Sequence, residues 1–148
     1  MLNFLSHNET ETIAIATDFA ASLQAGDVVA LSGELGAGKS VFSRAVMRAL
    51  GVSDEALPSP TFSIIQEYDG RDCRVAHMDW YRLHDGDEIT MLGVHDYFQS
   101  PWICLIEWAE RADDLLAETA IHVSLACVDG DLDKRSIEIR TVALKSRA

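Results

Sequence analysis

The sequence predicts an α/β domain of three layers, in which helices flank a mixed, partly antiparallel central sheet. Short apolar runs, typical of strands covered on both faces, alternate with segments whose apolar residues recur every three or four positions. The turn signals Asp69-Gly70 and Asp129-Gly130 each stand between two strand-like segments, as in antiparallel hairpins. No repeat or Pro/Gly/Ser-rich linker divides the chain, so residues 1–148 are expected to form a single domain.

The first part of the chain predicts two helices with a buried strand between them. One helix is expected over residues 9–25, because Asn8 is a suitable N-cap and Gly26 can close the segment. The continuous apolar run at 28–32 predicts a strand buried on both faces. The second helix is expected over 40–50, where apolar residues recur at helical spacing.

The remainder of the chain predicts strands with short helices between them. Short helices are expected near residues 87–92 and over 108–116, in the more polar stretches. The expected strands cover residues 62–68, 73–79, 102–106, 121–128 and 136–144.

The charge of the chain bears on its partners. It has 12 Lys and Arg residues against 24 Asp and Glu residues, a formal net charge of −12 at pH 7. Affinity for nucleic acid depends largely on basic side chains that neutralise phosphates. We therefore expect a role in nucleic-acid metabolism to be exercised through another protein that holds the nucleic acid. The alternative is that the acidity only aids solubility.

Neither the apolar runs nor the cysteines predict export or membrane association. The longest apolar runs are far shorter than the roughly 20 residues of a membrane-spanning helix. Residues 1–5 lack the features of a signal peptide. Cys73, Cys104 and Cys127 have no metal-ligand spacing and lie in strand-like apolar runs, so buried reduced thiols are expected. These observations favour a cytoplasmic protein without a membrane partner.

A phosphate-binding motif stands between the strand at 28–32 and the helix at 40–50. Glycines let backbone N–H groups converge on phosphate oxygens, and the helix directs the positive end of its dipole at the same anion. Lys39 is expected to reach the β- and γ-phosphates, and the Ser40 hydroxyl to bind Mg²⁺. The pattern G-x-x-x-x-G-K-[ST] is filled by Gly33, Glu34, Leu35, Gly36, Ala37, Gly38, Lys39 and Ser40. The sequence therefore predicts a P-loop NTPase-like fold.

Two carboxylates at strand ends are candidates to complete the site. Hydrolysis needs a second acid for the metal and a group that orients the attacking water. Glu107 follows the strand at 102–106, and Asp79 ends the strand at 73–79. If the C-terminal ends of these strands lie beside the P-loop, both acids reach the phosphates. A solvated carboxylate at a strand end is the alternative for each residue.

Other segments bear on the nucleotide and the metal. Thr61 lies where many P-loop proteins carry a nucleotide-sensing loop; a Pro-stiffened turn is the alternative. The chain lacks the Asn/Thr-Lys-x-Asp box of GTPases, which favours ATP over GTP. The acids and histidines at 77–88 match no known ligand motif, which argues against a transition-metal site.

The order of the motifs is specific. The P-loop is followed by Ser59-Pro60-Thr61-Phe62, His77-Met78-Asp79-Trp80-Tyr81-Arg82, Leu92-Gly93 with Asp96-Tyr97, and Glu107-Trp108-Ala109-Glu110. Over nearly the whole chain this order resembles the TsaE (YjeE) family, bacterial ATPases required for making threonylcarbamoyladenosine in tRNA. The resemblance implies ATP hydrolysis that is weak alone and depends on a TsaB–TsaD heterodimer. The tRNA would then be met only indirectly, through these partners.

The resemblance also implies roles for residues. Lys39 and Ser40 would serve the phosphates and the metal, and Glu107 would be the second Mg²⁺ ligand. Asp79 would be the catalytic or water-orienting acid, and Trp108 would pack near the nucleotide or the partner surface.

The resemblance places the adenine and marks one departure from the family. Adenine is expected near the start of the first helix, from Asn8 to Thr12, with Arg135 approaching the nucleotide. The family usually has Thr in place of Ser40, which keeps the hydroxyl. It often has a second Thr where this chain has Val41, so here the backbone N–H of Val41 must serve the α-phosphate.

Two other functions fit a P-loop. A small-molecule or nucleotide kinase would share the motif, but such kinases generally add an arginine-bearing lid, and the sequence has no comparably basic insertion. A nucleotide-sensing binding module would bind without hydrolysis even in the presence of partners.

Overall fold

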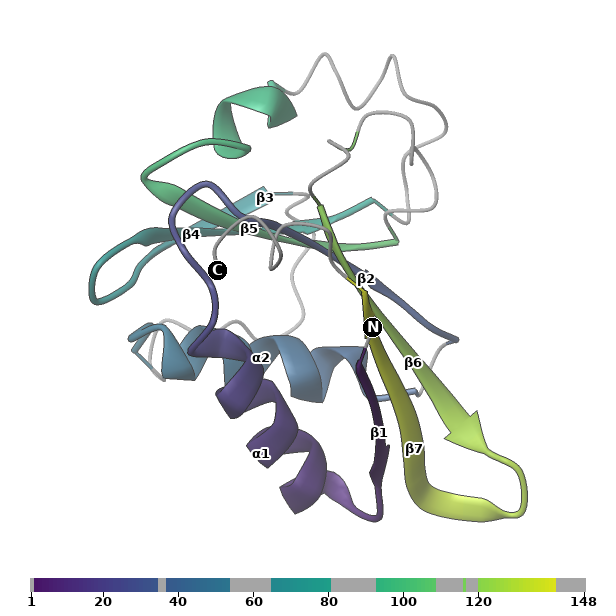
Figure 1. Ribbon diagram of the computed structural model, residues 1–148. Helices are drawn as coiled ribbons and strands as arrows, with labels where there is room; N and C mark the ends of the chain where they lie inside the picture. The colour runs from purple at the N-terminus through teal and green to yellow at the C-terminus, as the bar shows by residue number, and fades with distance from the viewer. Residues whose placement is uncertain are drawn as a thin grey trace.

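The computed structural model describes residues 2–34, 37–53, 65–80, 93–108, 116 and 120–140. These residues form a seven-stranded sheet with two α-helices and one 3₁₀ helix (Figure 1). In chain order the elements are β1 (Leu2–Ser6), α1 (Glu9–Ala20), β2 (Val28–Ser32), α2 (Lys39–Ala49), β3 (Ile65–Asp69), β4 (Arg74–Asp79), η1 (Val94–Tyr97), β5 (Trp102–Glu107), β6 (Ile121–Val128) and β7 (Asp131–Arg140).

The sheet is mixed, as the sequence predicts. Its strands follow the order β1-β7-β6-β2-β5-β4-β3. The four central strands, β6, β2, β5 and β4, run parallel, whereas β1, β7 and β3 pair antiparallel with their neighbours. Parallel strands share one C-terminal edge, so the loops that follow β2, β4 and β5 leave the sheet on the same side. This is the edge at which the sequence places the phosphate-binding loop.

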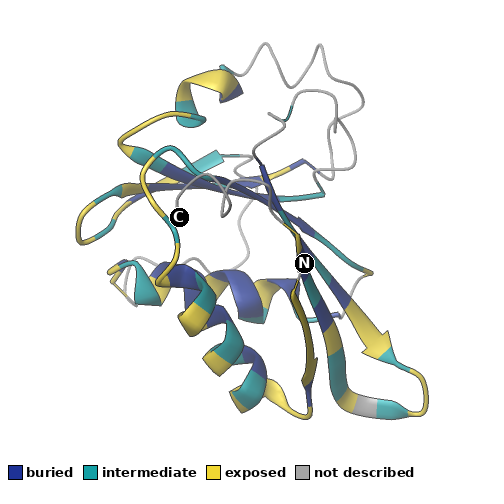
Figure 2. Ribbon diagram, viewed as in Figure 1, coloured by how far each residue is buried: buried dark blue, intermediate teal, exposed yellow. Residues whose placement is uncertain are grey.

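Each face of the sheet has its own apolar core. Helices α1 and α2 cover one face (Figure 1), where Leu31 and Leu105 pack with Phe42 of α2. Trp80 and Ile106 belong to a second core on the other face, which also includes Val94 of η1. Figure 2 shows that β2 and β5, at the centre of the sheet, are buried along most of their length. An apolar residue is therefore needed at nearly every position of β2, which explains its unbroken run of apolar residues.

Helix α1 begins as predicted but ends five residues before residue 25, at Ala20. The Asn8 side chain accepts a hydrogen bond from the Glu11 N–H at 2.8 Å and caps the helix. Gly26 does not close it. Its N–H instead bonds to the Trp102 carbonyl at 2.6 Å, so the segment before β2 is tied to the start of β5. This hydrogen bond to β5 is incompatible with a helical hydrogen bond at Gly26, so the helix does not continue to that residue.

The strand β1 was missed by the sequence analysis. Its large apolar side chains, Leu2 and Leu5, are 50% and 52% exposed, so they follow no core-facing alternation. The strand exists because it pairs with β7 along its whole length. Strand β7 itself starts at Asp131, earlier than the predicted residue 136, because its first residues are polar and give no apolar signal.

Several expectations fall wholly or partly on segments outside the described residues. They are the start of the strand at 62–68, the helix near 87–92, most of the helix at 108–116 and the end of the strand at 136–144. The described helices are all too short or too polar to cross a membrane.

The cysteines are not uniformly buried, contrary to the prediction. Cys104 is buried, and burial raises the pKa of its thiol. Cys73 is intermediate, and Cys127 is exposed. Cys127 lies at the irregularity near the end of β6, where the strand leaves the core.

Two glycines with the same backbone conformation but different surroundings give a test of packing. Gly51 (φ +99°) ends α2, and a Cβ there would lie 2.7 Å from the Arg71 nitrogen; Gly130 (φ +80°) lies in the β6–β7 turn with open space around it. We expect Gly130→Ala to cost about 1 kcal/mol, from the left-handed conformation alone. Gly51→Ala should cost about 2–4 kcal/mol, because overpacking is added.

Urea unfolding of the two variants measures this difference. Equal losses of unfolding free energy would show that the chain relaxes freely around Gly51 and would contradict the tight contact.

Candidate functional site

The described part of the phosphate-binding loop has the backbone conformation that its glycines permit. Gly33 has φ +148° and Gly38 has φ +98°, values that residues with side chains rarely adopt. A Cβ on Gly33 would also collide with the Leu125 carbonyl oxygen of β6. Leu35 and Gly36 lie outside the described residues. Glycine is thus required at Gly33 both by conformation and by the close approach of β6.

The N-terminus of α2 opens into a cavity. Gly38 is the N-cap residue, and no side chain caps the helix. The first N–H groups of α2 are therefore available to an anion, which the helix dipole also favours. The cavity has a volume of about 430 Å³, large enough for a small ligand. It is lined by Gly38, Lys39, Ser40, Val41, Asp79, Glu107, Trp108 and Arg135.

Lys39 presents a buried cation to this cavity. The residue is 6% exposed, and its ammonium finds no hydrogen-bond partner within the described part of the chain. The Trp108 ring lies against it, with the ring centroid 3.8 Å from Nζ. A cation–π contact compensates only partly for lost hydration, so a buried ammonium of this kind favours an anionic ligand.

Trp108 has an unusual backbone. Its φ is +62°, the only positive value at a non-glycine position among the described residues. A residue with a side chain in this region is strained by about 1–2 kcal/mol, and such strain is common at functional sites. The conformation places the indole over Lys39, directly after Glu107 at the end of β5.

Two carboxylates meet at the same edge of the sheet. Asp79 ends β4, Glu107 ends β5, and the two are register partners in the parallel ladder. The Trp80 N–H donates to the Glu107 carbonyl at 3.0 Å, which holds the strand ends together. Both acids line the cavity with Ser40. A hydroxyl and two carboxylates are the hard oxygen ligands that Mg²⁺ prefers, so these residues fit that ion.

His77 contacts one of these acids and was not assigned to the site by the sequence analysis. Its Nε2 lies 2.7 Å from Glu107 Oε2. The signal that could have found it is its spacing from Asp79, two residues away on the same face of a strand. The acidic and histidine group at 77–88 extends into residues that the structure does not describe. Within the described ranges, this site included, no cluster of three or more His, Cys, Asp or Glu side chains could hold a metal by itself.

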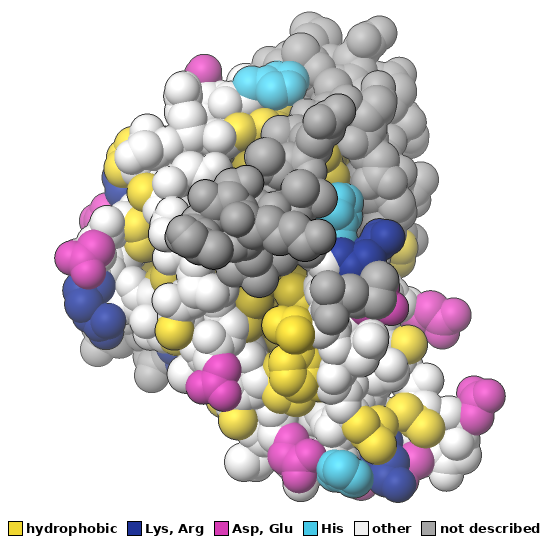
Figure 3. All heavy atoms as spheres, viewed as in Figure 1, with side chains coloured by type: hydrophobic (Ala, Val, Ile, Leu, Met, Phe, Trp, Pro, Cys, Tyr) yellow, Lys and Arg dark blue, Asp and Glu magenta, His cyan; other side chains and the backbone are white. Residues whose placement is uncertain are grey.

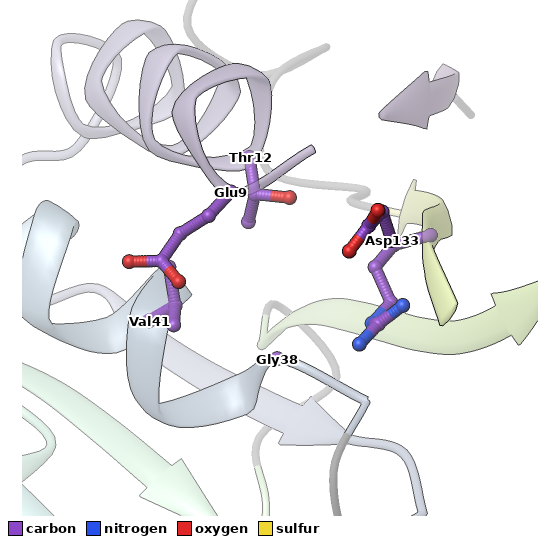
Figure 4. A pocket seen from close by; sticks show the side chains of 6 residues that line it. Glu9, Thr12, Gly38, Val41 and Asp133 are labelled. Atoms are coloured by element: carbon purple, nitrogen blue, oxygen red, sulfur yellow. The ribbon is translucent and has the colours of Figure 1, made fainter. Parts of the chain in front are cut away.

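A second hollow adjoins the phosphate cavity (Figure 4). Its volume is about 110 Å³, and its lining consists of Glu9, Thr12, Gly38, Val41, Asp133 and Arg135. The two hollows share Gly38, Val41 and Arg135. Glu9 and Thr12 come from the first turn of α1, and Asp133 comes from β7, as Figure 4 shows.

The residues expected around the nucleotide base are thus partly brought together. Arg135 Nε lies 3.9 Å from where a Cβ on Gly38 would stand, so it is next to the phosphate-binding loop. Thr12 Oγ1 is 2.7 Å from Ser6 Oγ, which fixes the start of α1 to β1. The Asn8 side chain caps α1 and is not part of the described lining of this hollow. Glu9 belongs to the expected segment from Asn8 to Thr12, whereas Asp133 was not predicted, because only the pairing of β7 with β1 and β6 brings it near α1. Thr61 lies outside the described residues.

The acidic side chains do not gather at one place on the face seen in Figure 3. Asp and Glu side chains are spread over it, as the net charge of −12 leads one to expect. The anion-binding features of the cavity are therefore local: backbone N–H groups, Lys39 and Arg135 within a predominantly acidic protein.

Comparisons with known proteins agree with the resemblance seen in the motifs. The family model described as "Threonylcarbamoyl adenosine biosynthesis protein TsaE" matches residues 6–137. The tRNA threonylcarbamoyladenosine biosynthesis protein TsaE of Bacillus subtilis is 38% identical over 141 residues, covering 95% of this chain and 86% of that protein. The Haemophilus influenzae protein of the same name is 38% identical over 112 residues, covering 76% and 68%.

A solved structure gives the same result for the fold. The crystal structure of Bacillus subtilis YdiB superposes with a TM-score of 0.79 at 31% identity, covering 99% of this chain and 88% of that one. The similarity therefore extends over the sheet, both helices and the site.

Because the Lys39 ammonium is buried without a hydrogen-bond partner in the described residues, we expect it to lower the stability of the ligand-free protein. Lys39→Met removes a buried charge and keeps most of the side-chain volume. We expect the unfolding free energy of the variant to equal or exceed that of the wild type, by up to about 2 kcal/mol. Denaturant unfolding without any ligand measures it. Lys134→Met, at a half-exposed position, is the control and should change stability by less than about 0.5 kcal/mol. A large loss for Lys39→Met would mean that the ammonium stabilises the fold.

Proposed function

The chain belongs to the TsaE family, and on that premise we propose that it binds and hydrolyses Mg-ATP in support of threonylcarbamoyladenosine formation in tRNA. Relatives of up to 38% identity carry this pathway in their names. The observation that best supports nucleotide binding is the buried Lys39 ammonium, which has no hydrogen-bond partner among the described residues and lies at an uncapped helix N-terminus.

The phosphates are proposed to bind the loop from Gly33 to Ser40. The N–H groups at the start of α2 donate to phosphate oxygens, and Lys39 turns from the Trp108 ring to the β- and γ-phosphates. The backbone N–H of Val41 serves the α-phosphate, because this side chain has no hydroxyl. Binding then satisfies the ammonium that is otherwise unpaired in the described structure.

The metal and the attacking water are proposed to lie between Ser40, Glu107 and Asp79. When bound, Mg²⁺ would neutralise part of the charge on the β- and γ-phosphates. Ser40 and Glu107 would hold it through their oxygens. Asp79 sits beside Glu107 in the register and is proposed to orient the water and accept its proton. Thr61 is proposed to approach the γ-phosphate.

The adenine and ribose are proposed to occupy the second hollow. Thr12 at the start of α1 and Arg135 of β7 line it, and it joins the phosphate cavity at Gly38. Arg135 lines both hollows, which supports a contact between its guanidinium and the phosphates next to the sugar. Asn8 contributes by fixing the start of α1 rather than by direct contact.

The partner is proposed to be a TsaB–TsaD heterodimer, with tRNA held by that pair in the cytoplasm. The net charge of −12 supports this arrangement, because an acidic chain repels a polyanion unless another protein binds it. The hydrolysis of ATP would reset the heterodimer between rounds.

Phosphate release by the pure chain, with and without TsaB–TsaD, tests the proposal. We expect slow turnover alone and at least tenfold stimulation by the pair. ADP formation that depends on an added phosphoryl acceptor would instead show a kinase. Tight ATP binding with no turnover in either setting would show a nucleotide sensor.

A variant at the end of β5 tests the metal ligand. Glu107→Ala should lower Mg²⁺-dependent ATP binding or turnover at least tenfold, since it removes one of two proposed protein ligands to the ion. Mg²⁺ titrations at fixed ATP measure the loss. The control is Glu138→Ala, an acid on β7 that pairs with Arg140 outside the cavity. Unchanged titrations for Glu107→Ala would remove this residue from the site.

A further inference from the structure

The His77 side chain contacts Glu107, the acid that ends β5, and both side chains are mostly buried. That of His77 is 15% exposed and that of Glu107 is 13% exposed. The Nε2–Oε2 distance of 2.7 Å is that of a strong hydrogen bond. An ionised carboxylate can only accept, so Nε2 carries the proton, whether the imidazole is neutral or cationic.

This bond restrains a carboxylate that would otherwise have a competing partner. Lys39 lines the same cavity as Glu107, and its ammonium has no hydrogen-bond partner among the described residues. In a mostly buried site, attraction between a free carboxylate and an ammonium is strong. An ion pair between them would remove the lysine from the phosphates and the acid from the metal at once.

We infer that His77 is a positioning residue, which holds Glu107 by Oε2 and so keeps it off Lys39 with its other oxygen free for Mg²⁺. The inference rests on the proposed function. The hydrogen bond needs only a donor at this position, and its effect on the nucleotide passes entirely through Glu107. Partners of metal-ligating carboxylates and histidines commonly act in this way.

The position of His77 in the sheet supports this role. His77 and Asp79 alternate with Ala76 and Met78, which belong to the core on the far face of β4. His77 therefore lies on the face covered by α1 and α2, with both acids of the site. Its register partner on β5 is Leu105, two residues before Glu107, so the imidazole reaches along β5 to the carboxylate.

Three variants separate positioning from a structural role. His77→Leu removes the donor, and His77→Gln retains one at a similar distance from the backbone. His122→Leu is the control: it makes the same His-to-Leu substitution on β6, at a histidine that lines neither hollow. The readout is the ratio of ADP dissociation constants without and with Mg²⁺, measured by calorimetry, so no turnover is required. Unfolding midpoints are recorded for each variant.

We expect His77→Leu to lower this Mg²⁺ ratio about tenfold, the lower end of the range for such partners. His77→Gln should stay within about threefold of the wild type, and His122→Leu should leave the ratio unchanged. Mg²⁺-free ADP binding should also weaken in His77→Leu, though less than binding with Mg²⁺ does, because Glu107 then competes for Lys39. Adding Glu107→Gln to that variant should restore Mg²⁺-free binding, since a neutral amide forms no ion pair with the ammonium.

Two results would overturn the inference while leaving the proposed metal site intact. One is a His77→Leu variant whose Mg²⁺ ratio equals that of a Mg²⁺-responsive wild type. The other is an equal fall of the Mg²⁺ ratio in His77→Leu and His77→Gln, together with lowered unfolding midpoints. That result would indicate a purely structural role. A wild type whose ADP binding ignores Mg²⁺ would refute the proposed metal site itself, and this inference with it.

Discussion

The parallel pairing of β2, β5 and β4 is the constraint on which the site depends. Leu31 pairs with Glu107, and Glu107 pairs with Asp79, so the register of two ladders brings both acids to the edge where the phosphate-binding loop starts. A slip of one residue would turn Glu107 to the opposite face of the sheet. Because both faces are packed with apolar side chains, burial fixes the register. The core therefore determines the geometry of the catalytic candidates.

The site concentrates features that disfavour the fold without a ligand. Lys39 is a buried cation, Trp108 has a left-handed backbone, and two acids are adjacent in the sheet. Like charges on neighbouring strands repel, and each of these features costs stability. A triphosphate with a divalent cation would compensate for the first and the third together. This shared requirement argues for one ligand across the cavity rather than for unrelated local irregularities.

The sequence predicts those features of the fold and the site that depend on neighbouring residues or on where a strand ends. The loop motif, β2, and the acids Asp79 and Glu107 all follow from patterns within a few residues. Tertiary pairing decides the rest: β1 is a strand only because β7 accepts it, and Asp133 reaches α1 only across that pairing. The end of α1 was misplaced because Gly26 bonds to β5. His77 was considered only as a transition-metal ligand, because its contact with Glu107 depends on the register of β4 and β5. The roles of all the site residues remain predictions, and for Leu35, Gly36 and Thr61 the structure describes no position either.

An acidic protein can bind an anion only if the groups that line the site outweigh the negative charges on the rest of the surface. At about 10 Å, a Debye length at 0.1 M salt, surface charges are largely screened, whereas groups inside a cavity are not. A nucleotide bound as proposed would therefore meet chiefly the α2 N–H groups, Lys39 and Arg135. An RNA backbone would remain outside and be repelled by the acidic side chains spread over the surface. The same reasoning makes the restraint of Glu107 important, because an unrestrained acid inside the cavity acts at full strength on the buried Lys39.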